Sequence, residues 1–270
     1  AGQAASQAIA SLRTDGFLGA IAMIGDESYL PYQRPPLSKK FLAGELEYER
    51  LFIKPAEFYP SAGVEMHLRR TATAIDTRAK SVRLDDGTLL DYGKLVIATG
   101  SRVRKLTIEG SGLDGLYYLR SIDDVRAIQA RFKPGAKLVI VGAGYIGLEV
   151  AAVAVKRGFD VTVLEVAPRV MARVTSKPIS DFYERVHREA GVKIRFGLGV
   201  TGFAGENNTV REVIAGNDRF PADLVVIGVG VLPNAELAGD AGIACDNGIV
   251  VDAYGRTSDP DVYAAGDCTN

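Results

Sequence analysis

The chain has 270 residues, of which 47% are hydrophobic and 24% are charged, a composition typical of globular proteins that excludes disordered and fibrous ones. Its 32 lysines and arginines nearly balance its 33 aspartates and glutamates, and a net charge of −1 gives no electrostatic reason to expect nucleic acid or an anionic membrane as a partner. The two cysteines, Cys245 and Cys268, are too few and too far apart for a disulfide framework or a cysteine-based metal site, and they favour a reducing compartment, the cytoplasm.

Short apolar runs rich in β-branched residues recur along the chain and predict strands. They are residues 20–24, 95–98, 138–141, 161–164 and 224–227. Continuous runs of this kind are typical of strands buried on both faces, as in a parallel sheet covered by helices. A helical pattern lies between two of the runs, over residues 146–157, with Gly158 as its C-cap. This alternation predicts an α/β fold with doubly wound, mostly parallel sheets.

Two other stretches, residues 71–91 and 200–222, alternate polar and apolar residues around turn sequences. The turns are Asp85-Asp86-Gly87 in the first stretch and Glu206-Asn207-Asn208 in the second. Both stretches therefore predict hairpins of antiparallel sheets. Each half of the chain then follows one plan, a βαβ unit, a hairpin region and a strand that ends in glycine, which favours an internal duplication into two Rossmann-like dinucleotide domains.

The most informative motif is G-x-G-x-x-G at Gly142, Gly144 and Gly147, between a predicted strand and a predicted helix. Such glycines permit a tight turn, close approach of the backbone to a pyrophosphate, and close packing of helix on strand, with the phosphates at the helix N-terminus. Glu165 follows Gly147 by about 18 residues, at the end of the next strand, where a carboxylate can bond the ribose 2′-OH. Its charge would repel a 2′-phosphate, which favours NADH, although Arg169 could accommodate one.

A partial copy of the motif stands at the start of the chain. Ala1-Gly2-Gln3-Ala4-Ala5 matches the later part of G-x-G-x-x-G/A, and a helical stretch to Arg13 and the predicted strand at 20–24 follow it. Asp26, about 24 residues after Gly2, lies where a ribose carboxylate is expected. We interpret these residues as a second dinucleotide site whose first glycine and first strand are missing.

Several segments occur in an order that resembles a known family. They are residues 31–39 (Pro-Tyr-Gln-Arg-Pro-Pro-Leu-Ser-Lys), 95–100, 142–149, 165–170, 228–234 and 262–268. The chain resembles, over essentially its whole length, the FAD-dependent ferredoxin reductases that serve bacterial oxygenases: the putidaredoxin, rubredoxin and aromatic-dioxygenase ferredoxin reductases. Residues 31–39 are the most specific part, because they separate this group from disulfide reductases with similar nucleotide motifs.

The resemblance implies a division into domains. Residues 1–110 and 247–270 would form a discontinuous FAD-binding domain, and residues 111–246 would form an NAD-binding domain. Members of the family begin with the first FAD strand and continue into a further C-terminal domain. We therefore expect an incomplete FAD domain in this chain, with an intact NADH site and weak or absent FAD binding.

The resemblance also assigns cofactor-binding residues, and it assigns no metal ligand. The FAD set is Gly2, Asp26, Arg34, Pro35, Lys39, Thr99, Gly100, Arg104, Gly266 and Asp267. The NAD set is Gly142, Gly144, Tyr145, Ile146, Gly147, Glu165 and Gly230. In the FAD set, Gly2 and Asp26 would hold the pyrophosphate and the adenosine ribose, and Asp267 would bond the ribityl chain. Arg34, Pro35 and Lys39 would lie at the flavin, whereas Thr99, Gly100 and Arg104 would lie near its phosphates.

The resemblance further implies that Lys39 and Glu149 form a catalytic pair near flavin N5. A cation beside the ring stabilises the electron density that arrives with hydride, and a carboxylate keeps that cation positioned and charged. Without the family context, the two residues would be an exposed lysine and a glutamate on a helix face.

The expected activity is that of an NADH-dependent ferredoxin reductase, a flavoprotein of electron transfer. Because Cys245 and Cys268 cannot form an adjacent redox pair, we expect hydride to pass from NADH to FAD and then single electrons to pass to an iron–sulfur partner, a ferredoxin or rubredoxin. Basic residues between Arg169 and Arg195 could steer an acidic ferredoxin or could simply form a solvated helix face.

Two alternatives stay open. The first is a related NADH flavoenzyme with another acceptor, such as the flavoprotein part of a nitrite reductase or an NADH oxidase; an oxidase would need a redox cysteine near residues 37–40, which contain none. The second is an NAD-binding fragment without turnover. We expect no membrane partner, since no apolar run approaches the roughly 18 residues that a span requires.

Overall fold

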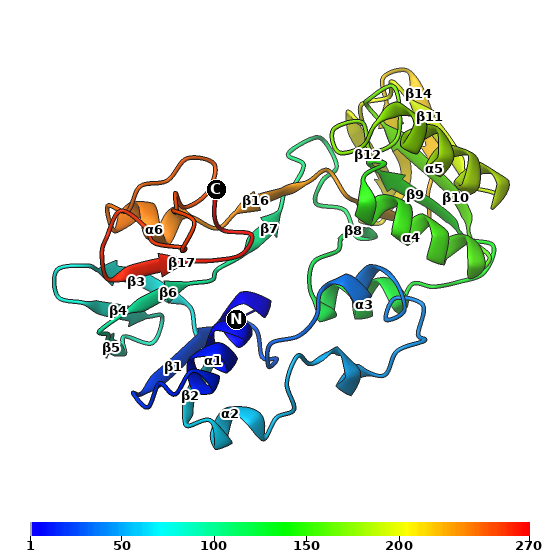
Figure 1. Ribbon diagram of the computed structural model, residues 1–270. Helices are drawn as coiled ribbons and strands as arrows, with labels where there is room; N and C mark the ends of the chain where they lie inside the picture. Colours follow the sequence, from blue (N-terminus) through cyan, green and yellow to red (C-terminus); the bar gives the residue numbers. More distant parts are fainter. Residues whose placement is uncertain (1) are drawn as a thin grey trace. The chain divides into compact units, whose positions relative to one another are not determined.

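The computed structural model describes residues 2–270, which fold into two compact units (Figure 1). The first unit contains Ala1–Gln33, Glu49–Arg102 and Leu232–Asn270. The second contains Arg34–Tyr48 and Val103–Val231. The α/β fold class with parallel sheets is confirmed in both units.

The second unit is built on a five-stranded sheet whose neighbouring strands are all parallel. In spatial order its strands are β11 (Lys193–Phe196), β10 (Asp160–Glu165), β9 (Lys137–Val141), β15 (Leu224–Ile227) and β8 (Leu116–Tyr118). Successive residues of a strand point to opposite faces, and Val139, Ile140, Val225 and Val226 are all at most 1% exposed. Both faces of the sheet are therefore covered, as the continuous apolar runs predict.

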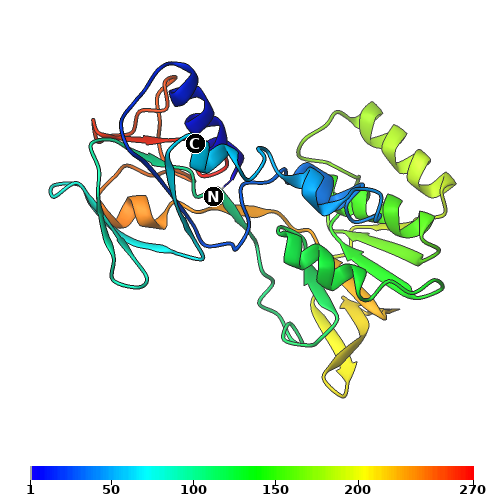
Figure 2. The same cartoon turned by 90° about the horizontal axis from the view of Figure 1, so that it is seen from below.

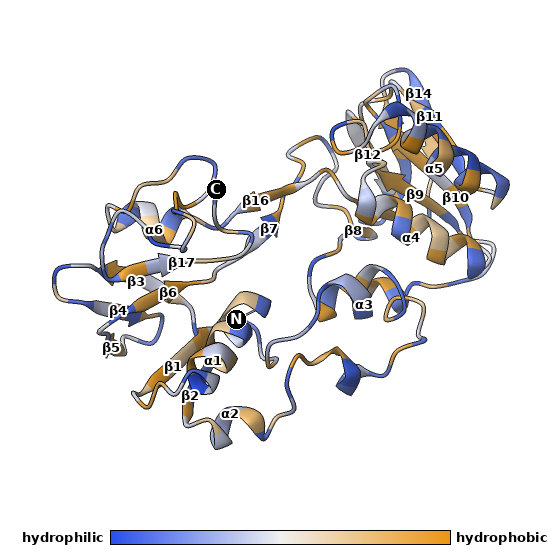
Figure 3. Ribbon diagram, in the orientation of Figure 1, coloured by the Kyte–Doolittle hydropathy of each residue, from blue (hydrophilic) through white to orange (hydrophobic). Residues whose placement is uncertain are grey.

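Different layers cover the two faces of this sheet. On one face, Val139, Val141 and Val225 share a core with residues of an antiparallel sheet made of β12 (Gly202–Glu206), β13 (Thr209–Ala215) and β14 (Asp218–Pro221). The helices α3 (Ile122–Gln129), α4 (Tyr145–Lys156) and α5 (Lys177–Glu189) pack on β8, on β9 and β10, and on β11 respectively (Figure 2). Figure 3 shows β9, the central strand of this sheet, in the orange of apolar residues.

The first unit holds two two-stranded parallel sheets and one antiparallel sheet. Their strands are β1 (Ile21–Gly25) with β2 (Val64–Leu68), β6 (Leu95–Ile97) with β17 (Val262–Ala264), and β3 (Ala72–Asp76), β4 (Ser81–Leu84) and β5 (Leu89–Asp91) in that order. The helix α1 (Gln3–Thr14) packs on β1, where Ile9 and Met23 share a core with Tyr59 of α2 (Phe58–Ser61). A second core joins the antiparallel sheet, β6, β17 and α6 (Glu236–Asp240).

Both predicted hairpin regions are confirmed as antiparallel sheets, β3-β4-β5 and β12-β13-β14. The strands β2 and β8 carry no signal that would have predicted them. Only Val64 is buried in β2, and β8 has just three half-buried residues, so neither strand shows a continuous apolar run. Two short strands, β7 (Ser101–Val103) and β16 (Val231–Pro233), pair where the chain crosses from one unit to the other.

The compact units have different bounds from the expected domains. Arg34–Tyr48 clusters with the second unit because its 3-10 helix η1 (Pro35–Ser38) contacts α3 and α4, and because Gln129 Nε2 donates to the carbonyl oxygens of Phe41 (2.7 Å) and Leu42 (3.3 Å). The last segment of the first unit begins at Leu232, before residue 247. The nucleotide that each unit binds stays a prediction. No helix among residues 2–270 is both long and apolar enough to cross a bilayer.

Two lysines bind one carboxylate at a junction of the first unit. Asp261, just before β17, lies 2.5 Å from Lys80 Nζ through Oδ2 and 2.5 Å from Lys94 Nζ through Oδ1. Lys80 precedes β4 and Lys94 precedes β6. The hydrogen bonds from Lys80 and Lys94 lower the pKa of Asp261 to about 2.

This pair of contacts predicts a pH dependence of stability. Because the pKa of Asp261 is 3.8 in an unfolded chain and about 2 in the folded one, its carboxylate stabilises the fold fully above about pH 4 and progressively less as the pH falls toward 2. We expect Asp261→Asn to unfold at lower urea than the wild type near neutral pH, and the difference to shrink on acidification. Urea titrations at several pH values measure it. A difference that does not change with pH would contradict the assignment, and Lys80→Met with Lys94→Met should remove the pH-dependent part.

Candidate functional site

The G-x-G-x-x-G segment forms the turn between β9 and α4. Gly142 has φ +102°, and a Cβ built on it would lie 2.4 Å from the carbonyl oxygen of Gly228. A Cβ on Gly147 would lie 2.1 Å from the carbonyl oxygen of Gly142. At Gly144, by contrast, a Cβ would meet nothing within 4 Å. Gly142 and Gly147 thus permit close contact between backbone segments, whereas Gly144 leaves open space at the N-cap of α4.

The start of α4 is suited to an anion. Gly144 is its N-cap and has no side chain that could accept from the first-turn N–H groups. Tyr145 and Ile146 begin the helix and are 51% and 37% exposed. The open space at Gly144 therefore lies where unsatisfied N–H groups and the helix dipole favour phosphate oxygens.

Glu165 lies beside this turn, at the end of β10. Its Oε2 accepts a hydrogen bond from Ala143 N (2.7 Å) and its Oε1 accepts one from Ala167 N (2.8 Å), so the carboxylate is held in one orientation. Arg169 is committed elsewhere: its guanidinium donates to the carbonyl oxygens of Ala172 (2.7 Å) and Thr175 (2.9 Å) and to a hydroxyl. The negative charge at the turn is therefore not offset by Arg169, which argues against a 2′-phosphate there.

The remaining residue of the expected NAD set lies at the same edge of the sheet. The strands β9, β10 and β15 are parallel, so their carboxyl ends lie at the same edge of the sheet. At this edge lie the turn at Gly142 after β9, Glu165 at the end of β10 and the segment Gly228–Gly230 after β15. Gly230 has φ +109°, and its carbonyl oxygen accepts from Arg104 N. After β9 the chain continues to β10 on one side, while β15 lies on the other, which is the switch point where open α/β sheets bind ligands.

The predicted catalytic pair is brought together within the second unit. Lys39 Nζ lies 2.8 Å from Glu149 Oε2 and also donates to the carbonyl oxygen of Pro35 (3.2 Å). The side chains of Lys39 and Glu149 are 48% and 28% exposed. Glu149 follows Tyr145 by one helical turn, so the pair lies about 6 Å along α4 from the open N-terminus.

Ser38, which has no role among the predictions from the sequence, also contacts the carboxylate of Glu149. Ser38 is 4% exposed, and its Oγ donates to Glu149 Oε2 at 2.5 Å. The signal was present, since Ser38 lies inside the specific motif at 31–39 and next to Lys39. Its part could not be inferred because nothing in the motif shows that a distant helix supplies the acceptor.

In the first unit, the turn at Gly266 lies against the first turn of α1. A Cβ on Gly2, the N-cap of α1, would meet nothing within 4 Å, whereas one on Gly266 would lie 3.3 Å from Ala4 Cβ. Asp267 Oδ2 accepts from the buried hydroxyl of Ser101 at 2.9 Å, a contact that sequence reasoning missed. Asp26 is exposed directly after β1. The open helix start, the Gly266 turn and an oriented carboxylate thus form a second candidate nucleotide site.

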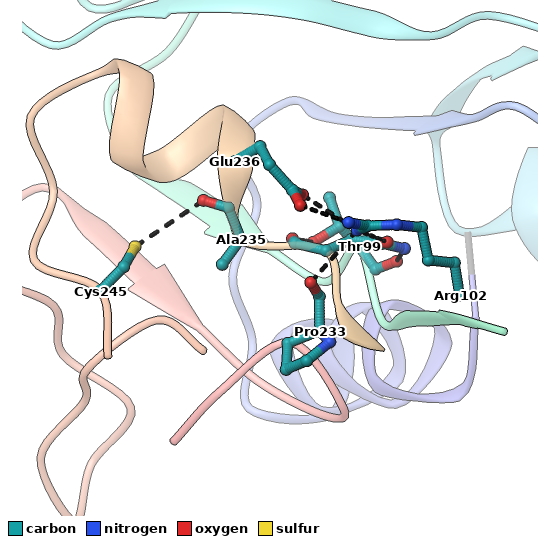
Figure 4. Close-up of polar contacts among 7 residues, drawn as sticks. Thr99, Arg102, Pro233, Ala235, Glu236 and Cys245 are labelled. Carbon is teal, nitrogen blue, oxygen red and sulfur yellow. Dashed lines mark hydrogen bonds and ion pairs between the residues drawn. The ribbon is translucent and has the colours of Figure 1, made fainter. Parts of the chain in front are cut away.

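Thr99 and Gly100 are fixed by a network around Arg102 (Figure 4). Thr99 Oγ1 donates to the carbonyl oxygen of Asn234 (2.6 Å), and Asn234 Nδ2 donates back to the carbonyl oxygen of Thr99 (2.9 Å). Arg102 donates to Asn234 Oδ1 (2.8 Å) and to both carboxylate oxygens of Glu236, which lowers the pKa of Glu236. The turn between β6 and β7 therefore has one defined shape.

The residues expected to bind NAD lie in one unit, whereas those expected to bind FAD are divided between the two units. The NAD set and the pair Lys39–Glu149 lie in the second unit. The FAD set is divided: Arg34, Pro35, Lys39 and Arg104 belong to the second unit, and Gly2, Asp26, Thr99, Gly100, Gly266 and Asp267 belong to the first. The assignment of these residues to FAD and NAD stays a prediction.

The basic residues around α5 are largely paired. The ion pairs are Lys177–Asp181, Arg185–Glu189, Arg188–Glu184 and Lys193–Asp160, at 2.6–3.4 Å. The surface of α5 carries alternating charges, an arrangement that favours the solvated helix face over a basic docking face. Within residues 2–270, no group of three or more His, Cys, Asp or Glu side chains is arranged to bind a metal ion.

Comparisons with known proteins bear on the whole chain. The sequence profile of the family described as "Pyridine nucleotide-disulphide oxidoreductase" matches residues 1–270. The chain is 44% identical over 269 residues to a ferredoxin–NAD(P)(+) reductase of Sphingomonas, and 43% identical over 263 residues to the putidaredoxin reductase of Pseudomonas putida. These alignments cover 99% and 95% of the chain, but only 65% and 62% of the relatives.

A solved structure is also similar to this chain over nearly its whole length. The crystal structure of a covalent putidaredoxin reductase–putidaredoxin complex superposes with a TM-score of 0.97 at 42% identity. The match covers 99% of this chain and 66% of that one. The chain is thus similar in fold and sequence to these reductases and spans somewhat less than two thirds of their length.

The three glycines of the turn should respond differently to the addition of one methyl group. We expect Gly144→Ala to leave stability unchanged and to weaken NADH binding about tenfold or more, because the methyl enters open space that the phosphates would occupy. Gly147→Ala should weaken binding and also lower the melting temperature, since its methyl collides with the oxygen of Gly142. Fluorescence titration with NADH and thermal unfolding measure the two effects.

Gly112→Ala is the matched control, because a Cβ there meets nothing within 4 Å and the residue lies outside the turn. It should change neither quantity. Unchanged NADH affinity in Gly144→Ala would contradict the assignment of the turn to the dinucleotide.

Proposed function

This chain belongs to the pyridine nucleotide-disulphide oxidoreductase family, and we propose that it transfers electrons from NADH through FAD to a one-electron iron–sulfur acceptor, a ferredoxin or rubredoxin of an oxygenase system. The observation that carries the proposal is the Lys39–Glu149 pair, one helical turn from the open N-terminus of α4. The proposed location is the cytoplasm, where such oxygenase systems find NADH.

The glycine turn fits NADH. The open space at Gly144 admits the pyrophosphate against the first N–H groups of α4, and Glu165 is oriented beside it for the adenosine ribose hydroxyls. Because one helix carries both Gly144 and Glu149, a dinucleotide whose phosphates lie at the start of α4 can extend its nicotinamide toward the Lys39–Glu149 pair.

The start of α1 fits FAD by the same chemistry. The space at Gly2 and the first N–H groups of α1 suit a pyrophosphate, while the Ser101–Asp267 hydrogen bond fixes a carboxylate for the hydroxyls of the ribityl chain. FAD, when bound, supplies the link between a two-electron donor and a one-electron acceptor.

Lys39 and Glu149 have separate tasks in this proposal. The Lys39 ammonium is the cation that would face the ring, and its partial exposure leaves it accessible from solvent. Glu149 accepts from that ammonium at 2.8 Å and keeps it beside the site that the ring would occupy. Preorganised charge of this kind stabilises a developing negative charge without reorganisation during the reaction.

The cysteines support an external acceptor. Both are free thiols, with Cys245 exposed and Cys268 fully buried, so neither pairs with the other within the chain. The relatives are named for ferredoxin and putidaredoxin, one-electron carriers, which agrees with electrons leaving singly.

Turnover with NADH, added FAD and a [2Fe–2S] ferredoxin tests the function. With FAD in large excess, so that even a weak site is filled, we expect NADH to bleach the flavin and ferredoxin reduction to exceed oxygen consumption. Lys39→Met and Glu149→Gln should slow bleaching by about tenfold or more, because each removes part of the charge pair beside the ring. Lys40→Met, which removes the adjacent exposed lysine, is the control and should behave as the wild type.

Two results would overturn the proposal. Binding of NADH without flavin binding or bleaching would make the chain a nucleotide-binding module. Bleaching followed by electron delivery to oxygen, and not to ferredoxin, would assign it to the NADH flavoenzymes with another acceptor.

Coenzyme preference should depend on Glu165. We expect Glu165→Ala to lower the ratio of NADH to NADPH affinity by about tenfold or more, because it removes the charge that repels a 2′-phosphate. Dissociation constants for both coenzymes give the ratio. Glu206→Ala, on the exposed hairpin of the same unit, should leave it unchanged. An unaltered ratio in Glu165→Ala would mean that another residue selects the coenzyme.

A further inference from the structure

Two donors converge on one oxygen of Glu149. Ser38 Oγ is 2.5 Å from Oε2 and Lys39 Nζ is 2.8 Å from the same atom. Among residues 2–270, no donor to the other oxygen, Oε1, is present. The carboxylate is therefore held by one oxygen, and the second oxygen is available to a bound molecule.

The two donors differ in how firmly they are placed. The Lys39 side chain is half exposed on a flexible stem, and an exposed ion pair of this kind does little to fix its partner. Ser38 is 4% exposed, so its short side chain has little freedom. Of the two contacts, the hydroxyl is the one able to orient the carboxylate.

The backbone that carries Ser38 is itself fixed to the second unit. η1 begins with two prolines, Leu37 is 1% exposed, and Leu37 N donates to the carbonyl oxygen of Arg34. Arg34 Nη1 in turn donates to the carbonyl oxygen of Arg120 at 2.7 Å, just before α3. The hydroxyl of Ser38 is thus presented to α4 by a segment that is attached independently of Lys39.

The hydroxyl of Ser38 and the ammonium of Lys39 meet on the same oxygen, Oε2. The orientation of the carboxylate therefore sets where the ammonium is held. Ser38 therefore acts on Lys39 through Glu149, although it makes no contact with the ammonium in the described residues.

We propose that Ser38 is a positioning residue: its hydroxyl holds the carboxylate of Glu149 in one orientation, with Oε2 toward Lys39 and Oε1 toward the nucleotide. The inference deepens the proposed function and rests on it for the role of the pair. The placement of Ser38 itself is independent of any cofactor.

The first test needs neither flavin nor NADH. In protein with 13C-labelled glutamate carboxyls, at one fixed pH near neutrality, we expect the carboxyl resonance of Glu149 to move in Ser38→Ala, because the carboxylate loses the hydrogen bond that holds it in one orientation. Glu149→Gln identifies the resonance. Ser38→Thr keeps the hydroxyl and should restore most of the wild-type value, whereas Ser111→Ala, an exposed serine of the same unit, should change nothing.

The second test uses the protein with FAD in excess. The rate of flavin bleaching by saturating NADH should fall about tenfold in Ser38→Ala while the affinity for NADH stays unchanged, because a carboxylate that is no longer oriented does not hold the Lys39 ammonium in place, and Ser38→Thr should restore the rate. A serine that served packing alone would lower the melting temperature and leave the bleaching rate unchanged.

The outcomes separate the two proposals. An unmoved Glu149 resonance in folded Ser38→Ala overturns the role of Ser38, whatever the activity. A moved resonance in a protein that shows no bleaching by NADH leaves Ser38 positioning Glu149 and removes the proposed function alone. If Ser38→Thr fails to fold, Lys39→Met supplies the second comparison: it should move the Glu149 resonance less than Ser38→Ala does, because the half-exposed ammonium does less to fix the carboxylate. An equal or larger movement in Lys39→Met would overturn the role of Ser38.

Discussion

The geometry of the second unit depends on close backbone approaches at the turn between β9 and α4. A Cβ on Gly142 would collide with the carbonyl oxygen of Gly228, and a Cβ on Gly147 would collide with the carbonyl oxygen of Gly142. These approaches allow the segment after β15 to lie against the segment after β9, and they set α4 close upon the sheet. Everything proposed for the site depends on this geometry, since α4 supplies both the open helix start at Gly144 and the carboxylate of Glu149.

A second constraint brings Lys39 to that helix. The segment Arg34–Tyr48 lies far from α4 in sequence, yet its buried leucines and its hydrogen bonds with Arg120 and Gln129 attach it to the second unit. The polar contacts of Ser38 and Lys39 with Glu149 follow from this apolar and backbone attachment. The charge pair is thus a consequence of packing, and a half-exposed pair would not by itself hold the segment in place.

The nucleotide motifs could be read from the sequence because their physics is local. Gly142, Gly144 and Gly147 are required at fixed spacing by one turn, and the apolar runs of β9, β10 and β15 show by composition alone that both sheet faces are covered. The hairpins β3-β4-β5 and β12-β13-β14 were predictable for the same reason, since alternation and turn residues act over a few positions. The short edge strands β2 and β8 were not, because their pairing depends on neighbours distant in sequence.

By itself, the sequence determined the fold class, the glycine turn, the acidic residue at the end of β10 and the family to which the motifs point. Only the tertiary structure decided that Arg34–Tyr48 packs with α3 and α4, and that the Arg169 guanidinium donates to carbonyl oxygens of the loop that follows it. It also decided that Ser38 and Lys39 meet on one oxygen of Glu149. The physical reason is distance along the chain. A turn or strand is specified by adjacent residues, whereas a hydrogen bond between residues 38 and 149 exists only after two separate elements have packed together.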